Sequence, residues 1–351
     1  MLSLSSLQSS KIRLPLFSNP SSIAHSLHRS SNLNYNHQKH TTKHHSLCIR
    51  ALDAAQPYIT EAVDNDRFEN SKKLKIAIVG FGNFGQFLAK TLVRQGHTVL
   101  AHSRTDYTDI AKKLGVLFFP DADDLCEEHP EVVLLCSSIL STESVLRSLP
   151  LQRLKRSTLF VDVLSVKEFP RKLFLQILPA EFDVLCTHPM FGPESGKDSW
   201  KDLPFVYDKV RIGDDESRIS RCEKFLDIFA QEGCGMVEKS CAEHDKVAAG
   251  SQFITHTVGR ILEIFGLEST SINTKGYETL LNLVENTSGD SFELYNGLFL
   301  YNKNAIDQLQ RLDMAFESLK KQLFGHLHSI IRKQLFENVE GFEEPPSENM
   351  G

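Results

Sequence analysis

The residue best placed to do chemistry is His188, which closely follows the apolar run 184–186. It opens the segment 188–193, with the sequence HPMFGP, in which the prolines and the glycine fix and then turn the backbone. A neutral imidazole at a strand end can accept a proton from a substrate hydroxyl while a hydride leaves the same substrate. A histidine that caps a buried strand end fits the same pattern, so the residue types leave both roles open.

A second polar segment follows the apolar run 158–161. Its residues 162–167 read DVLSVK, and Ser165 supplies a hydroxyl among them. In a parallel sheet, ligands bind in the crevice at the carboxyl ends of the strands. We therefore expect Ser165 and His188 to face the same ligand.

A third group of polar side chains lies in the helical pattern 241–265. Gln252, His256 and Arg260 are spaced by four residues, so one helix face presents all three. His256 could meet a substrate carboxylate or orient a water, although most single histidines on such helices are structural. The full group is His244, Asp245, Lys246, Gln252, His256 and Arg260.

The elements that must position these groups begin with a strand–turn–helix signal. An apolar run at 75–79 breaks into G-x-G-x-x-G, and helical spacing follows over 84–95. Such glycines allow a tight turn, close approach of backbone to a pyrophosphate, and close packing of helix on strand. The helix N-terminus adds unpaired N–H groups that attract the anion, so the pattern predicts a dinucleotide site. The expected contacts are Gly80, Gly82, Asn83, Phe84 and Gly85, with Ser137 after the run 132–136.

The next apolar run, 98–101, indicates which dinucleotide binds. NAD-binding folds place an acid about 20 residues after the glycines to hold the ribose hydroxyls. No Asp or Glu occurs between Gly85 and Thr105. Ser103, Arg104 and Thr105 instead offer hydrogen-bond donors and one fixed positive charge, which suits the 2′-phosphate of NADP. NAD bound without its usual acid, beside a solvated Arg104, is the alternative.

Short apolar runs alternate with helical patterns as far as about residue 237, and the strand signals then stop. The expected strands are 75–79, 98–101, 116–119, 132–136, 158–161, 184–187, 205–207 and 235–237. This alternation predicts an α/β fold: a doubly wound, mostly parallel sheet with helices on both faces, followed by an all-α part. We expect a Rossmann-like NADP-binding domain over 74–240 and a helical substrate-binding and dimerisation domain over 241–339.

The helical part carries a long apolar stripe over 303–338. The stripe predicts either a contact between two subunits or a core helix of the same subunit. We expect a homodimer with the helical domain at its centre. The stripe residues, at steps of three and four, are Ile306, Leu309, Leu312, Phe316, Leu319, Leu323, Leu327 and Ile330.

The first 52 residues differ in composition from the rest. They contain no Asp or Glu, six Lys or Arg residues, six His residues and many Ser residues. This composition is typical of a disordered organelle transit peptide and is too polar for a secretory signal. The serine content favours the chloroplast over the mitochondrion. We interpret the His-rich stretch 37–45 as targeting sequence and expect no metal site.

Charge and cysteine usage exclude several classes of function. The chain has a formal charge of −6, and because the first 52 residues are basic, residues 53–351 carry −12. An acidic body argues against nucleic acid and anionic membranes as partners. The seven cysteines are scattered without a C-x-x-C pair, which indicates a reducing compartment. We expect a polar linker at 53–73 and a disordered acidic tail at 340–351.

Three segments together resemble the arogenate/prephenate dehydrogenases of tyrosine biosynthesis. They are the glycine motif at 80–85, the D-V-x-S-V-K pattern at 162–167, and HPMFGP at 188–193, which is the most specific. With the transit-like arm and the H-S-R sequence at 102–104, the chain is similar to the plant plastid members. The resemblance implies NADP-dependent oxidative decarboxylation of arogenate to tyrosine.

The resemblance also implies roles for individual residues. The family histidine matching His188 bonds the ring hydroxyl and promotes its deprotonation, and the serine matching Ser165 bridges nicotinamide and hydroxyl. Positions matching Gln252 and His256 face the substrate. Asp290 matches a position where arogenate-type plant members carry Asp and prephenate-type members carry Asn. Its own context reads as a helix N-cap, so both roles stay open.

The sequence differs from many family members at the residue that binds the side-chain carboxylate of the substrate. Many bacterial members use an arginine there, and the matching segment 276–286 contains none. The possible anchors are Arg260, Lys246, Lys275 and Lys197. Asp198 is a second acid that could read the substrate ammonium.

Three other functions stay compatible with the sequence. A prephenate-preferring dehydrogenase has the same fold, and Asp290 argues against it. An NADP-dependent β-hydroxyacid or imine reductase would use a catalytic lysine, which Lys246 could match, but it has no role for HPMFGP. An NADP-sensing protein without catalysis predicts a degraded crevice, whereas Ser165, His188 and His256 are all present.

Overall fold

The computed structural model describes residues 73–337. Every described residue belongs to the part of the chain that follows Gln56. The predicted transit peptide at 1–52, the predicted linker as far as residue 72, and the predicted tail at 340–351 lie outside the described residues.

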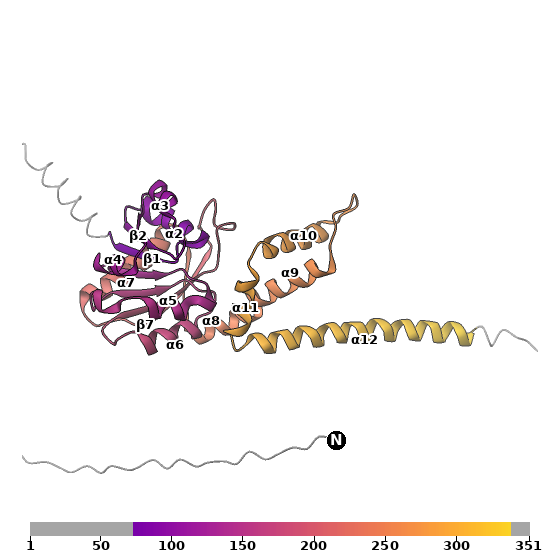
Figure 1. Cartoon of the computed structure of the whole chain (residues 1–351). Helices are drawn as coiled ribbons and strands as arrows, with labels where there is room; N and C mark the ends of the chain where they lie inside the picture. The colour runs from indigo at the N-terminus through magenta and orange to yellow at the C-terminus, as the bar shows by residue number, and fades with distance from the viewer. Residues whose placement is uncertain (1–72, 338–351) are drawn as a thin grey trace, which may run out of the picture. The chain divides into compact units, whose positions relative to one another are not determined.

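An eight-stranded sheet forms the first part of the described chain (Figure 1). Its order is β3-β2-β1-β4-β5-β6-β7-β8, and within it only β6 and β7 pair antiparallel. The first six positions follow the 3-2-1-4-5-6 order of dinucleotide-binding folds, in which the ligand binds where the strand order reverses, here between β1 and β4. The strands are β1 (Lys75–Val79), β2 (Thr98–His102), β3 (Leu117–Phe118), β4 (Val132–Leu135), β5 (Leu159–Asp162), β6 (Asp183–Pro189), β7 (Pro204–Arg211) and β8 (Gly235–Glu238).

Helices cover both faces of this sheet, as predicted. Successive residues of a strand point to opposite faces, so Ile76 and Ile78 of β1 pack in one core while Ala77 and Val79 pack in the other. The first core is closed by α2, α3 and α7, and the second by α4, α5 and α6. These helices are α2 (Asn83–Arg94), α3 (Thr108–Leu114), α4 (Ala122–Glu127), α5 (Thr142–Ser148), α6 (Glu168–Ile177) and α7 (Glu216–Gln231).

After β8 the described chain is helical, which confirms the predicted fold class. Helices α9 and α10 lie side by side (Figure 1). A Cβ atom on Gly259 would lie only 2.1 Å from Oγ1 of Thr287, so this contact requires glycine. The elements are α8 (Cys241–Ala248), η3 (Ala249–Phe253), α9 (Ile254–Phe265), α10 (Lys275–Ser288), α11 (Phe292–Leu300) and α12 (Ala305–Glu337).

The helix expected over 241–265 is interrupted by a π-helical stretch, η3, between α8 and α9. A π-turn is wider than an α-turn, occurs mostly as a single turn inside an α-helix, and is frequent at functional sites. The apolar periodicity could not reveal it, because one wide turn shifts the pattern by a single residue. Gln252 lies inside this stretch.

The helical part packs on the loops that leave the carboxyl ends of β4 and β5. Phe253 and Leu298 share a buried core with Ile139 and Val166. A Cβ atom on Gly297 would lie 2.8 Å from Cδ1 of Ile139, so α11 approaches the short helix η1 (Ile139–Ser141) closely. The first helical residues after the sheet are thereby held beside the crevice.

The apolar stripe of α12 is exposed. Phe316, Leu319 and Leu323 are 61%, 54% and 64% exposed. The interpretation of this stripe as a core helix of the same subunit is therefore wrong for the described part of the chain. Within the same residues, no helix combines the length and the apolar character needed to cross a membrane.

Candidate active site

The glycines of the turn between β1 and α2 leave room for a dinucleotide. Gly80 has a φ of +99°, and a Cβ atom there would lie 2.8 Å from the carbonyl group of Cys136. A Cβ atom on Gly85 would lie 2.4 Å from the carbonyl oxygen of Gly80. On Gly82, by contrast, a Cβ atom would meet nothing within 4 Å, so the space in front of it is open. The turn therefore fits a bound pyrophosphate.

Helix α2 presents its N-terminus to this open space. Gly82 is the N-cap, no side chain caps the helix, and its first turn holds no acid. Asn83 and Phe84 are its first two residues, and their N–H groups suit a phosphate. Ser137 lies next to the glycine turn, because its backbone nitrogen would be 2.9 Å from a Cβ atom on Gly80.

The end of β2 offers cationic and polar groups. Ser103 is half-buried, and Arg104 and Thr105 are exposed. The first acid after them, Asp106, accepts hydrogen bonds from the backbone nitrogen and the hydroxyl of Thr108, at 2.9 and 2.6 Å. The Asp106 carboxylate therefore already binds the first residue of α3.

A buried ion pair lies at the carboxyl ends of β5 and β6. The Lys167 ammonium contacts Oδ1 of Asp162 and the carbonyl oxygen of Thr187, and both charged residues are almost completely buried. Burial raises the pKa of Asp162, and the Lys167 ammonium opposes that shift. The pair joins the loop that carries the half-buried Ser165 to the strand that carries His188.

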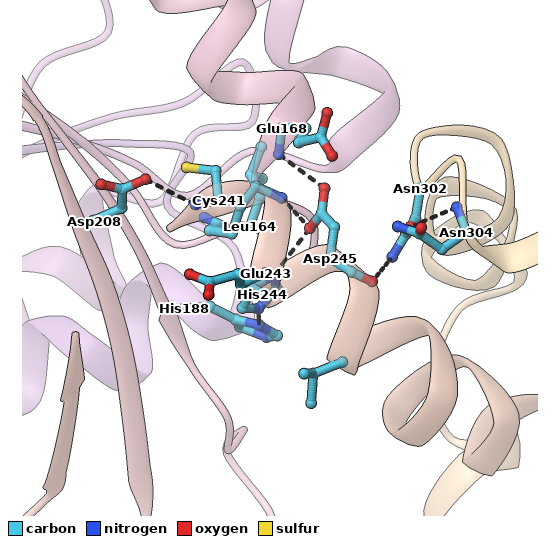
Figure 2. A network of polar contacts seen from close by, with 12 residues as sticks. Leu164, Glu168, His188, Asp208, Cys241, Glu243, His244, Asp245, Asn302 and Asn304 are labelled. Carbon is cyan, nitrogen blue, oxygen red and sulfur yellow. Dashed lines mark hydrogen bonds and ion pairs between the residues drawn. The ribbon is translucent and has the colours of Figure 1, made fainter. Parts of the chain in front are cut away.

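His188 lies near the end of β6 and is 3% exposed. Its Nδ1 is 2.8 Å from Nε2 of His244, and Figure 2 shows the two rings in contact. Within the described residues its other nitrogen, Nε2, has no hydrogen-bond partner and is not a fully buried atom. Burial, and secondarily His244 and Lys167, hold the pKa of His188 well below 6.5. The ring is therefore neutral near pH 7, with one nitrogen available to a ligand.

His244 and Asp245 lie on the first turns of α8, whose start is fixed by a capping box between Ser240 and Glu243. Asp245 Oδ1 accepts a hydrogen bond from Nδ1 of His244 at 2.9 Å. The sequence groups His244 and Asp245 with the other polar residues of this helix. It could not reveal the contact with His188, because 56 positions separate the two histidines.

The predicted helix face with Gln252, His256 and Arg260 carries buried polar atoms that lack hydrogen-bond partners within the described part of the chain. Among the described residues, each of the three has a buried polar atom without a hydrogen-bond partner: Oε1, Nδ1 and Nε respectively. A buried polar atom left unpaired costs about 1–3 kcal/mol. Burial also lowers the pKa of His256, the neighbouring Asp290 opposes this shift, and Arg260 adds to it. A polar ligand would supply the missing partners.

Asp290 stands beside this face. Its Oδ2 is 3.6 Å from Nδ1 of His256, and its carbonyl oxygen accepts a 2.8 Å hydrogen bond from Nη2 of Arg260. The N-cap of α11 is Ser291, whose hydroxyl accepts the N–H of Leu294. The interpretation of Asp290 as an N-cap is therefore wrong. Its half-exposed carboxylate can face a cation.

The remaining predicted candidates lie on the surface. Lys246 is exposed, whereas its neighbours His244 and Asp245 are buried. Arg260 differs from the exposed lysines: its guanidinium lies 5.1 Å from the ring centre of Phe292, which fixes its direction. No three His, Cys, Asp or Glu residues in the described part of the chain are placed to hold a metal ion. The other exposed candidates are Lys197, Asp198 and Lys275.

Comparisons with known families and solved structures agree with this architecture. The family described as NADP oxidoreductase coenzyme F420-dependent matches residues 75–165, and the TYRAAT1-like, C-terminal domain family matches residues 261–335. Prephenate dehydrogenase from Aquifex aeolicus, solved with hydroxyphenyl propionate and NAD+, superposes with a TM-score of 0.57 at 18% identity, over 75% of this chain and 95% of that one. Synechocystis arogenate dehydrogenase gives a TM-score of 0.52 at 20% identity, over 76% and 99%.

The fold and the site together define a nicotinamide-dependent dehydrogenase with a Rossmann-like sheet and a helical second part. Arogenate dehydrogenase 2, chloroplastic, from Arabidopsis thaliana is 69% identical over 291 residues, which cover 83% of this chain and 81% of that protein. Arogenate dehydrogenase 1, chloroplastic, is 71% identical over 80% of this chain, which spans under half (44%) of that longer protein. The chain belongs to the arogenate dehydrogenase family, as its motifs predicted.

We expect the His188 imidazole to stay neutral as the pH falls from about 8 to about 6, the range over which a free histidine becomes protonated. A group whose pKa is lowered becomes protonated only at lower pH, and burial lowers this one. An NMR titration of the chain labelled with 15N-histidine checks this, with free histidine as reference and His188→Gln to identify the signal. A midpoint at or above 6.5 would contradict the expectation.

Proposed function

We propose that this chain catalyses the NADP-dependent oxidative decarboxylation of arogenate to tyrosine. The observation that carries the proposal is the neutral His188 ring at the carboxyl edge of the sheet, with one nitrogen available to a ligand. The open turn at Gly82 would hold the dinucleotide at the same edge. Membership of the arogenate dehydrogenase family supports the choice of substrate.

The reaction needs accurate positioning and one temporary proton acceptor. The dinucleotide supplies a hydride acceptor for the ring carbon that bears the hydroxyl group. As that hydride leaves, Nε2 of His188 takes the hydroxyl proton and a carbon–oxygen double bond forms. The carboxylate on the opposite ring carbon departs as carbon dioxide, and its electron pair makes the ring aromatic. The resulting phenolate oxygen takes the proton back. We assign Ser165 to hold the hydroxyl beside the nicotinamide.

We assign the side chain of arogenate to the face that Gln252, His256 and Asp290 share. Arogenate carries an ammonium group where prephenate carries a ketone. The Asp290 carboxylate pairs with an ammonium group and gains nothing from a ketone. Arg260 lies on the same face with an unpaired Nε and suits the side-chain carboxylate.

We expect Asp290→Asn to lower kcat/KM for arogenate by roughly 10- to 100-fold, because a hydrogen bond to a charged group contributes about 1.5–3 kcal/mol. The value for prephenate should stay or rise. Steady-state kinetics of the full chain with NADP, on both acids side by side, measure the change.

The matched control is Asp198→Asn, which neutralises an exposed acid. A parent enzyme that prefers prephenate would contradict the proposed substrate. Loss of arogenate activity in Asp198→Asn alone would transfer the role to Asp198. Inactivity on both acids would favour the reductase or the NADP-sensing function.

We propose NADP rather than NAD as the cofactor. Ser103, Arg104 and Thr105 follow β2, and the nearby acid, Asp106, is bonded to Thr108. Arg104 can therefore meet a 2′-phosphate without a competing carboxylate from Asp106.

We expect Arg104→Ala to raise the KM for NADP by roughly 10- to 100-fold and to leave the KM for NAD nearly unchanged, because only NADP carries the phosphate that Arg104 would bind. Kinetics with each cofactor measure this. Arg147→Ala, an exposed arginine on α5, is the control. An equal loss with both cofactors would count against the assignment.

We propose that two copies of the chain meet through α12. This helix has 33 residues, which is about 50 Å of length. Its apolar stripe is exposed in the single chain, and a continuous exposed apolar surface marks an interface. A second copy offers the same apolar surface in return.

We expect the parent chain to have a mass near twice 39.6 kDa in solution. The double variant Leu319→Glu, Leu323→Glu should shift it to the monomer, because four charges in the symmetric interface would lose their water. Light scattering after size exclusion measures both. Lys321→Glu, an exposed residue of the same helix, is the control. A monomeric parent would refute the dimer.

Location in the chloroplast is also proposed. The two Arabidopsis relatives are named chloroplastic. The acid-free arm at 1–52 has the composition of a transit peptide.

The reductase alternative has little support from the site. Such an enzyme would need Lys246 to face the reacting carbon. Lys246 is exposed on α8, whereas His244, which contacts His188, and Asp245 are buried.

A further inference from the structure

His188 and two buried side chains behind it form a continuous hydrogen-bonded series (Figure 2). Nδ1 of His188 lies 2.8 Å from Nε2 of His244, and Nδ1 of His244 lies 2.9 Å from Oδ1 of Asp245. His244 and Asp245 are 3% and 2% exposed. The proposed reaction uses His188 and assigns no task to the other two.

The Asp245 carboxylate determines which nitrogen of His244 donates to it. Asp245 Oδ1 and Oδ2 also accept the backbone N–H groups of Lys167 and Glu168, at 2.7 and 2.8 Å, so this carboxylate acts only as an acceptor. Nδ1 of His244 must then carry a proton and donate it. When His244 carries only this one proton, its other nitrogen, Nε2, is an acceptor, and His188 donates to it from Nδ1. This leaves Nε2 of His188 without a proton.

We propose that His244 and Asp245 are positioning residues that hold His188 in the one tautomer able to accept the substrate's hydroxyl proton. An isolated imidazole has two neutral tautomers, and only one leaves Nε2 bare. When Nε2 takes the proton, the Asp245 carboxylate stabilises the positive charge through His244. The inference rests on the proposed function for the identity of the hydroxyl donor.

Asp245 also fixes the other side of the reacting centre. Through Lys167 and Glu168 it holds the start of α6 and the end of the loop that carries Ser165. Its own carbonyl oxygen accepts a 2.8 Å hydrogen bond from the side chain of Asn302. One residue thus fixes the tautomer of His188 and the position of the serine loop.

The direct test is to find which ring nitrogen of His188 carries the proton. Long-range 1H–15N NMR of the full chain, labelled with 15N-histidine, reads the tautomer without substrate. We expect the proton on Nδ1 in the parent. In His244→Phe, which keeps a ring and removes the acceptor, we expect the Nε2–H form to appear. In His244→Gln, whose amide oxygen can accept from Nδ1, we expect the parent tautomer.

Kinetics with arogenate and NADP should follow the tautomer. We expect His244→Phe to lower kcat by roughly 100-fold with KM nearly unchanged, since general base catalysis contributes about 10²–10⁴-fold. His244→Gln should stay within roughly tenfold of the parent. His97→Phe removes a half-buried histidine that bonds the backbone of Leu74, and it controls for loss of packing.

A proton on Nε2 of His188 in the parent would overturn the proposal, and this measurement needs no variant to fold. An unchanged tautomer and kcat in His244→Phe would overturn it as well. A parent that is inactive on arogenate but carries the proton on Nδ1, and loses it there in His244→Phe, would refute the proposed function and support the positioning role.

Discussion

The structure depends on the buried side chain of Lys167. An ammonium group can stay charged inside a protein only if oxygen atoms surround it. For Lys167 this compensation comes from Asp162 at the end of β5 and from the carbonyl oxygen of Thr187 on β6. Removing one partner of such a buried pair costs about 3–5 kcal/mol. The loop after β5 is therefore fixed against the end of β6, and Ser165 and His188 take their positions from that bond.

The electrostatic character of the site changes from one end to the other. At the turn after β1, the N-terminus of α2 offers uncompensated positive potential to phosphates. At His188 the side chain is neutral, because burial disfavours its charged form. On the helical face, Arg260 and Asp290 place opposite charges around His256. An anionic dinucleotide, a neutral reacting hydroxyl and a zwitterionic side chain fit these three environments in turn.

Most of the fold could be predicted from the sequence, because strands buried on both faces appear as unbroken apolar runs between turn residues. The glycine turn was equally readable, because the spacing of its glycines between an apolar run and a helical pattern is itself the signal. Besides the π-helical stretch, three features were not readable. The contact of His188 with His244 depends on chain segments far apart, the cap of α11 is Ser291 rather than Asp290, and the exposure of α12 depends on what surrounds it.

The π-helical stretch at Ala249–Phe253 lies between α8 and α9, so the number of residues along this continuous helix affects the direction of the side chains on α9. Each residue of an α-helix turns the following chain by about 100°. If one residue were deleted within this stretch, α-helical bonding could continue unbroken from α8 into α9. His256 and Arg260 would then keep the place they now share with Asp290, because the wide turn holds one residue more than an α-turn for the same rotation. A deletion in the α-helical part of α8 would instead turn both side chains away by about 100°. The direction of the substrate face is thus encoded by a count of residues as well as by their chemistry.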